Sequence, residues 1–135
     1  MNLDFASVWE TIADIVPEND ALICGDEVVS WKDYDLNSSK IATALLNAGL
    51  SANSKAGLYL NNSNEYLIAQ NAIFKIGGVP INVNYRYMAE ELIYLLDNSD
   101  SEAVFYHACY SGRIKEIASS LPNIKAWIEI PDGTK

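Results

Sequence analysis

Short apolar runs alternate along the chain with segments whose apolar residues recur at helical spacing. The first two runs, residues 21–24 and 28–31, flank the turn-forming residues Gly25-Asp26-Glu27 and predict a short β-hairpin. Ser30 lies three residues before Asp33, which is typical of a helix cap, and Gly49 marks the end of that helix. One face of the predicted helix carries Tyr34, Ser38, Ile41, Leu45 and Ala48.

Strands and helices continue to alternate after this helix. We expect strands at residues 56–60, 79–83, 103–106 and 125–130, and helices at about 64–76, around 92–97 and at 111–119. Asn62 is placed to cap the helix at 64–76, because it lies three residues before Glu65. Pro80 is compatible with a strand only at its start or at a sheet edge. The pattern therefore predicts an α/β fold with a largely parallel sheet, flanking helices and a short N-terminal β-hairpin.

A sheet of this kind places ligands beyond the carboxyl ends of its strands. In this chain those ends are expected at residues 61–63, 82–87, 107–110 and from 131 onward. We therefore look for chemistry in these four segments.

The length and charge narrow the classes of function. A chain of 135 residues with half its residues hydrophobic suits one domain that folds without disulfides or metals. Nine basic residues against 18 acidic ones give a net charge of −9, which repels nucleic-acid phosphates, so we expect no nucleic-acid partner. Residues 1–67 hold three of the bases and ten of the acids, so an anion site is expected in the second half.

The cysteines and the chain start suggest a cytoplasmic location. Cys24 and Cys109 form neither a redox pair nor a zinc cluster, and we expect both to be small buried hydrophobes. The start is acidic where a secretory signal is basic. No apolar run approaches the ~20 residues that a membrane-spanning helix needs, so no transmembrane segment is expected.

The familiar catalytic motifs are missing. Gly77-Gly78 precedes a predicted strand rather than a helix, so it is neither a dinucleotide fingerprint nor a phosphate loop. His107 is the sole histidine, and a structural role is favoured over that of a catalytic base. Glu90-Glu91 opens a helix, where negative charge interacts favourably with the helix dipole. We predict no catalytic residue and no metal ligand.

Arg86 is the one candidate for binding. It lies between two tyrosines in Asn-Val-Asn-Tyr-Arg-Tyr (residues 82–87), at a predicted strand end just before a helix. A guanidinium and helix amides both favour phosphate, which makes this a possible anion site. The alternative is that Arg86 pairs with Glu90 or Glu91 while the tyrosines pack, and the residues alone favour this alternative.

Four segments, taken in order, carry a family resemblance. Residues 29–34 read Val-Ser-Trp-Lys-Asp-Tyr, residues 57–66 Gly-Leu-Tyr-Leu-Asn-Asn-Ser-Asn-Glu-Tyr, residues 74–82 Phe-Lys-Ile-Gly-Gly-Val-Pro-Ile-Asn, and residues 84–92 run from Asn-Tyr-Arg-Tyr to Glu-Leu. They resemble four motifs of the adenylate-forming (AMP-binding) enzymes, which include the acyl-CoA synthetases. The resemblance covers about residues 5–130, and Asn-Val-Asn-Tyr-Arg-Tyr looks most like the fatty-acyl-CoA synthetase branch.

The resemblance implies a two-step reaction for a full-length protein. Such enzymes use ATP and Mg²⁺ to convert a carboxylic or fatty acid to an acyl-adenylate, and coenzyme A then displaces AMP. In some CoA ligases of the family the arginine of Asn-x-Arg helps to hold the 3′-phosphate of coenzyme A, which implies this role for Arg86.

The resemblance also sets limits. The family's phosphate loop and mobile C-terminal domain have no counterpart in residues 1–135, which therefore resemble only the first subdomain of the N-terminal AMP-binding domain. We expect the isolated chain to be inactive and to bind none of these cofactors tightly, with the acid substrate held by the missing downstream region.

Two hypotheses remain. An N-terminal piece of an acyl-CoA synthetase should expose apolar surface and self-associate. A free-standing, non-catalytic α/β binding or interaction module should instead have polar outer faces and melt cooperatively as a monodisperse protein.

Overall fold

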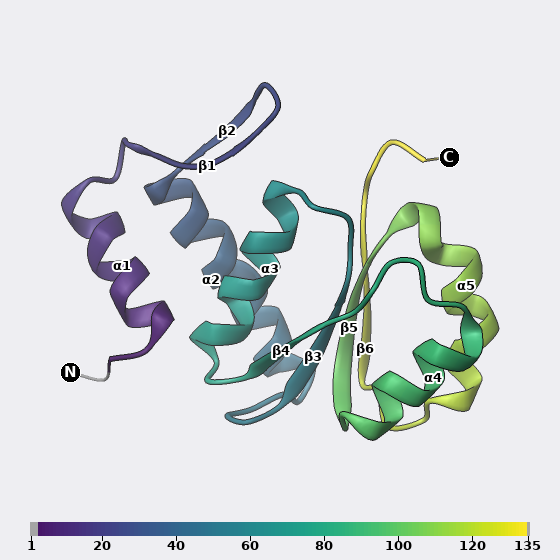
Figure 1. Ribbon diagram of the computed structural model, residues 1–135. Coiled ribbons are helices and arrows are strands. Elements are labelled where there is room, and N and C mark those ends of the chain that lie inside the picture. Colours follow the sequence, from purple (N-terminus) through teal and green to yellow (C-terminus); the bar gives the residue numbers. More distant parts are fainter. Residues whose placement is uncertain (1–2, 135) are drawn as a thin grey trace.

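The computed structural model describes residues 3–134, and it is an α/β fold (Figure 1). Helix α1 (Phe5–Ile15) precedes a hairpin of β1 (Asp20–Cys24) and β2 (Glu27–Ser30). The following elements are α2 (Trp31–Asn47), β3 (Lys55–Tyr59), α3 (Asn64–Lys75), β4 (Val79–Asn82), α4 (Ala89–Asn98), β5 (Ser101–His107), α5 (Ser111–Ile117) and β6 (Ala126–Ile130), with 3-10 turns at Ala108–Tyr110 and Ala118–Ser120. The predicted fold class, with its flanking helices and N-terminal hairpin, is confirmed.

The main sheet is parallel, with strand order β4-β3-β5-β6, and the hairpin forms a separate antiparallel pair. The Val79 N–H donates to the Ser54 carbonyl at 2.8 Å, so strand alternation turns the nitrogen of Pro80 to the outer edge of β4. Pro80 therefore occupies the edge position that the sequence predicted. At the opposite edge, the Lys125 N–H donates to the Glu102 carbonyl at 2.7 Å as the chain enters β6.

Helices cover both faces of the sheet (Figure 1). On one face, Leu58 and Phe105 of the strands pack with Leu45 of α2 and Ile73 of α3. On the other face, Tyr59 and Val104 pack against the helices α4 and α5, which contribute Leu92, Leu96, Ile114 and Ile117. Neighbouring residues of a strand point to opposite faces, which explains why its whole apolar run is buried.

Side-chain caps set where the helices begin. The Ser30 hydroxyl accepts the Asp33 N–H at 3.1 Å, so α2 begins at Trp31, a residue that we had assigned to the preceding strand. The expected cap of α3 by Asn62 is wrong, because it is Ser63 that accepts the Tyr66 N–H, at 3.2 Å. An N-cap side chain reaches the amides two or three residues ahead, and Asn62 lies one position too early for the turn that forms.

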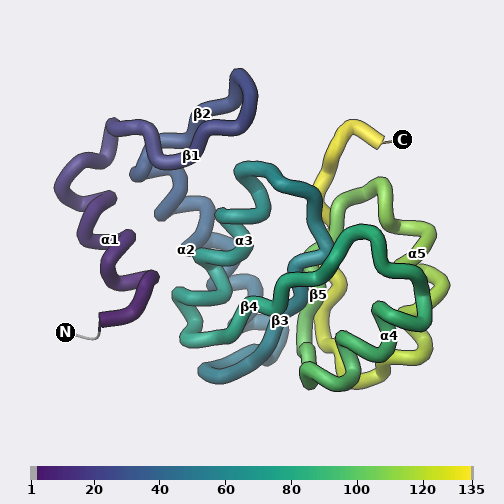
Figure 2. Tube along the Cα trace, in the orientation of Figure 1, coloured from purple at the N-terminus to yellow at the C-terminus, as the bar shows by residue number. Residues whose placement is uncertain are grey.

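Helix α1 has no counterpart among the predicted elements. It begins at an Asp4 cap, whose carboxylate accepts the Ser7 N–H at 2.7 Å, and it buries Ala6 and Ala13. Its aromatic rings pack on α3, with ring centroids 5.3 Å apart for Phe5 and Phe74. Figure 2 shows α1 beside α2 and α3, at the opposite end of the molecule from α4 and α5.

Lys75 at the end of α3 joins three helices. Its ammonium group lies 2.8 Å from a Glu10 oxygen on α1 and 2.7 Å from an Asp35 oxygen on α2. Burial lowers the pKa of Lys75, but the hydrogen bonds to Asp35 and Glu10 outweigh it and leave the pKa above its ordinary value. This ion-pair cluster fastens α1 to the rest of the fold.

Both cysteines are exposed, so the expectation that they are buried hydrophobes is wrong. Cys24 ends a strand of the two-stranded hairpin, and Cys109 lies in the 3-10 turn after β5, where little protein covers either side chain. Within residues 3–134 no helix is long and apolar enough to cross a membrane.

Candidate functional site

The carboxyl ends of the four parallel strands lie along one edge of the sheet, as expected. The segments that follow the strands are residues 60–63, 83–88, 108–110 and 131–134. Because the strands are parallel, these segments form one rim, and the hairpin lies beside it (Figure 1).

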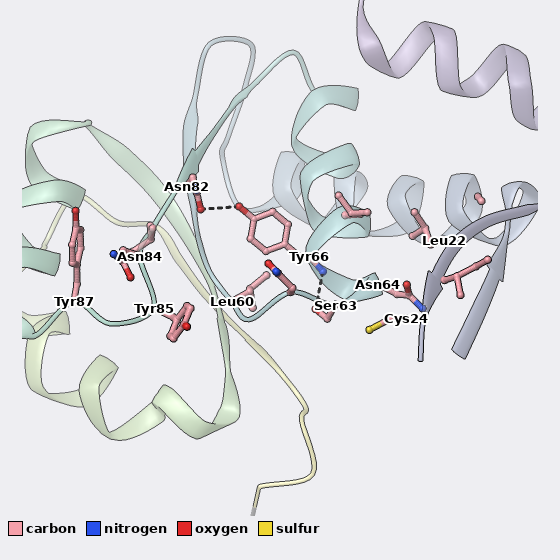
Figure 3. A pocket seen from close by; sticks show the side chains of 15 residues that line it. Leu22, Cys24, Leu60, Ser63, Asn64, Tyr66, Asn82, Asn84, Tyr85 and Tyr87 are labelled. Atoms are coloured by element: carbon pink, nitrogen blue, oxygen red, sulfur yellow. Dashed lines mark hydrogen bonds between the residues drawn. The ribbon is translucent and has the colours of Figure 1, made fainter. Parts of the chain in front are cut away.

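A cleft of about 830 Å³ opens at this rim, between the hairpin, the start of α3 and the loop after β4 (Figure 3). Its walls combine apolar groups such as Leu22 and Leu60 with amides and hydroxyls. The polar lining consists of Asn62, Ser63, Asn64, Tyr66, Asn82, Asn84, Tyr85 and Tyr87. Among the described residues that line it there is no Lys, Arg, Asp or Glu. The cleft therefore suits an uncharged group with hydrogen-bonding atoms more than an ion.

A tyrosine and an asparagine join the two sides of this cleft. The Tyr66 hydroxyl of α3 donates to the Asn82 side-chain oxygen at 2.9 Å, a contact that Figure 3 draws as a dashed line. Burial raises the pKa of Tyr66, so it stays protonated and can act as this donor at neutral pH. Tyr66 was not predicted to take part in this site, although Asn82 was already expected at a strand end.

His107 makes a structural contact at the end of β5. It is buried, and its Nδ1 accepts the Asn61 N–H at 2.9 Å, which ties β5 to the end of β3. The Asn61 side-chain oxygen accepts the Tyr110 hydroxyl at 2.6 Å, and the Tyr110 ring stacks on Tyr59 with centroids 4.4 Å apart. These contacts support the structural role that the sequence favoured for His107.

Asp132 lies in the segment that follows β6, and its carboxylate accepts several hydrogen bonds. Hydrogen bonds from Thr134 and Cys109, including both backbone amides at 2.9 Å, hold the pKa of Asp132 well below its usual range. Partial burial and the nearby Asp132 raise the pKa of the Cys109 thiol. A thiol whose pKa is raised carries less thiolate and is a poor nucleophile, so Cys109 is not an activated cysteine.

Arg86 is presented to solvent by a loop with a defined backbone. The Asn84 side-chain oxygen accepts the Arg86 N–H at 2.9 Å, and the Asn84 carbonyl accepts the Tyr87 N–H at 3.0 Å. The guanidinium carbon of Arg86 lies over the Tyr85 ring, 5.5 Å from its centroid.

The alternative reading, in which Arg86 pairs with Glu90 or Glu91, is wrong. Within the described part of the chain no carboxylate lies within ion-pair distance of Arg86. Glu91 is engaged elsewhere, because its side-chain oxygen accepts the Met88 N–H at 3.1 Å and caps α4. Tyr87 packs against the core on the α4 side, as that reading expected, but Tyr85 is 47% exposed and is not packed into the core.

The rim offers no metal centre. Residues 3–134 contain no group of three or more histidines, cysteines and carboxylates placed to hold a metal ion. Among residues 3–134, the rim therefore provides a neutral cleft and, beside it, the exposed Arg86, which forms no ion pair there.

Comparison with known proteins shows the family. The family model described as AMP-binding enzyme matches residues 9–132, so the chain belongs to the AMP-binding enzyme family. It is 37% identical over 132 residues to a medium/long-chain-fatty-acid–CoA/3-oxocholest-4-en-26-oate–CoA ligase of Mycobacterium marinum. It is 35% identical over 134 residues to a 3-oxocholest-4-en-26-oate–CoA ligase of Rhodococcus rhodochrous. These alignments cover 98% and 99% of this chain but only 24% of each relative, so the chain spans about a quarter of their length.

Solved structures show the same fold. The N-terminal domain of FACL13 from Mycobacterium tuberculosis superposes with a TM-score of 0.86 at 22% identity, over 93% of this chain and 33% of that one. A Mycobacterium tuberculosis fatty acyl CoA synthetase gives a TM-score of 0.84 at 22% identity, over 93% of this chain and 26% of its own. At this level of identity the likeness establishes the architecture and leaves the chemistry to the residues.

Proposed function

We propose that residues 1–135 form the first subdomain of the N-terminal AMP-binding domain of an acid–thiol ligase. In this proposal the whole enzyme activates a carboxylic or fatty acid with ATP and Mg²⁺, and then transfers the acyl group to coenzyme A in the cytoplasm. The family match over residues 9–132 and the CoA-ligase names of the relatives support it. The single observation in this chain that carries it is the unpaired Arg86 beside a neutral cleft.

The described residues are better suited to binding coenzyme A than to binding ATP or Mg²⁺. ATP and Mg²⁺ need a phosphate cradle and carboxylate ligands, and the cleft lining within the described residues has neither. We therefore assign no ATP chemistry to this subdomain, and we place acid binding outside it. Coenzyme A fits better, because Arg86 can donate to a phosphate from a position beside the cleft.

The role of Arg86 can be tested in a chimera in which this chain replaces the matching quarter of the Mycobacterium marinum relative. The change Arg86→Ala should raise KM for coenzyme A by about tenfold, since it removes a charge-assisted contact at an exposed site. ATP–pyrophosphate exchange should be unchanged, because adenylate formation does not use coenzyme A. Lys40→Ala, which removes an exposed charge from α2, is the matched control. An unchanged KM for coenzyme A in Arg86→Ala would refute the assignment.

The chain by itself should not activate acids. An ATP–pyrophosphate exchange assay on the 135-residue polypeptide should give no signal above a buffer blank, because the chain offers ATP no cradle. Exchange above that blank would show that the adenylation apparatus lies within these residues after all.

We also propose that the isolated chain self-associates through exposed apolar surface. Leu3 is 86% exposed, Ile15 and Tyr94 are each 72% exposed, and Ile23 is 67% exposed. Light scattering should show species larger than a monomer, and a hydrophobic dye should bind the folded chain. A monodisperse, cooperatively melting monomer that binds no dye would favour the second hypothesis, a free-standing α/β interaction module.

A further inference from the structure

We propose that Tyr85 is a positioning residue, whose ring holds the Arg86 guanidinium ready to bind a nucleotide 3′-phosphate. This inference rests on the anion-binding role proposed for Arg86 and adds the device that prepares the arginine for it. The ligand class is a phosphate monoester on a nucleoside, and the contact is made at the rim of the cleft.

The backbone of the loop is fixed on both sides of Arg86. Asn84 accepts two amides, the Arg86 N–H at its side chain and the Tyr87 N–H at its carbonyl. Arg113 of α5 donates to the Tyr87 carbonyl at 3.4 Å, which connects the loop to a neighbouring helix. These contacts set the direction in which the Arg86 side chain leaves the loop, but they do not restrict the side chain itself.

The Tyr85 ring supplies that restriction. A guanidinium within about 6 Å of a ring centroid is attracted by the ring, and here the distance is 5.5 Å. The guanidinium carbon lies over the ring, so the attraction favours the rotamers of Arg86 that keep it there. The contact uses none of the guanidinium N–H groups in a hydrogen bond, whereas an ion pair with a carboxylate would occupy them.

The nearby acids and the second arginine are arranged consistently with this role. Glu91 is occupied by the Met88 N–H, and Arg113 pairs with Glu116 at 3.4 Å. Arg86 thus remains the arginine whose edge is open to an anion. A side chain ordered before binding loses less conformational entropy on binding, so the affinity for phosphate rises without a new contact to the ligand.

The test uses the whole 135-residue chain and NMR titration with adenosine 3′-phosphate, with adenosine as the probe that lacks phosphate. Tyr85→Leu should raise the apparent Kd for adenosine 3′-phosphate by about two- to fivefold, the range expected for an exposed cation–π contact. Tyr85→Phe keeps an aromatic ring and should bind like wild type. Neither change should alter the response to adenosine, and the side-chain Nε–H signal of Arg86 should lose its ring-current shift only in Tyr85→Leu.

The outcomes separate this inference from the proposed function. If wild type shows no saturable, phosphate-dependent shift, or if Arg86→Ala binds as wild type does, the anion-binding role of Arg86 fails. If Arg86→Ala weakens binding and Tyr85→Leu does not, the positioning role of Tyr85 is overturned. If Tyr85→Leu still weakens binding in the Arg86→Ala background, Tyr85 acts on the ligand directly and the inference is likewise overturned. Amide spectra that superpose away from the loop establish that each variant is folded.

Discussion

Replacing Lys75 by methionine should loosen helix α1 and lower the free energy of unfolding. Methionine keeps an unbranched apolar stem, so the packing along α3 is largely retained while both ion pairs are lost. The ammonium side is well covered, with a lysine side chain 8% exposed, but Glu10 and Asp35 are 48% and 36% exposed and can regain water. Hydrogen bonds to charged groups stabilise by about 1.5–3 kcal/mol and exposed pairs by less than 1, so we expect a loss of about 1–2 kcal/mol in total.

The pH dependence of this loss has a definite sign. Partner carboxylates raise the pKa of Lys75 above its ordinary value of 10.5, so the folded state holds its proton more tightly than the unfolded state. The stabilisation is therefore fully present below pH 10.5 and is lost as the pH rises through the higher folded value. The difference between wild type and Lys75→Met should be constant near neutral pH and should shrink above pH 10.5.

Urea titrations followed by far-UV circular dichroism measure this difference, and Lys115→Met, at an exposed lysine of α5, controls for the loss of charge. Proteolysis within residues 5–15 should also become faster in Lys75→Met, because α1 is fastened by this cluster. If the two lysine variants unfold at the same urea concentration, the ion-pair cluster does not stabilise the fold and the reasoning is refuted.

Three further substitutions test the packing and a buried hydroxyl. A Cβ at Gly78 would lie 2.8 Å from the Ser54 carbonyl oxygen and 3.0 Å from Ile73 Cγ2, so Gly78→Ala should destabilise by about 1–3 kcal/mol in urea titrations. Gly112→Ala, in α5 with no atom within 4 Å of the new Cβ, should instead stabilise by about 0.5–1 kcal/mol, and equal effects at the two glycines would contradict the packing argument. Burial raises the pKa of Tyr34 to about 12, and its hydroxyl donates to the Leu67 carbonyl at 3.2 Å. Tyr34→Phe should therefore cost about 0.5–1.5 kcal/mol below pH 10, and wild type should lose this advantage between pH 10 and about 12; a pH-independent difference would exclude the buried phenol as its source.

The alternation of strands and helices could be read from the sequence because each buried element has its own periodicity. Helix α1 was not predicted, although its sequence carries the same kind of signal: Asp4 stands at a cap position, and Phe5, Trp9 and Ile12 recur at helical spacing. What the sequence could not show is the partner of this helix. Its aromatic residue Phe5 remains 62% exposed and contacts Phe74, almost seventy positions along the chain.

The candidate site was only partly predictable for a similar reason. Strand ends could be located, and with them Asn61, Asn82 and Arg86. The sequence could not show whether Arg86 forms an ion pair, because Glu90 and Glu91 lie close to it along the chain. Only the structure shows that Glu91 caps α4 and is engaged there. The prediction that both cysteines are buried was wrong, because residue type alone does not determine burial. Burial depends on where the hairpin and the turn that carry the cysteines lie in the folded chain.

The two edge strands of the parallel sheet, β4 and β6, differ in the backbone N–H groups that they offer to a further strand. On β4 the outer edge lacks a donor at Pro80, whereas β6 contains no proline and alternation turns the amides of Ala126, Ile128 and Ile130 outward. A strand that extends this sheet therefore finds a continuous row of outward amides at β6 and an interrupted one at β4. Two copies paired through their β6 edges would use that row in both molecules, which favours a closed pair over a growing chain of copies.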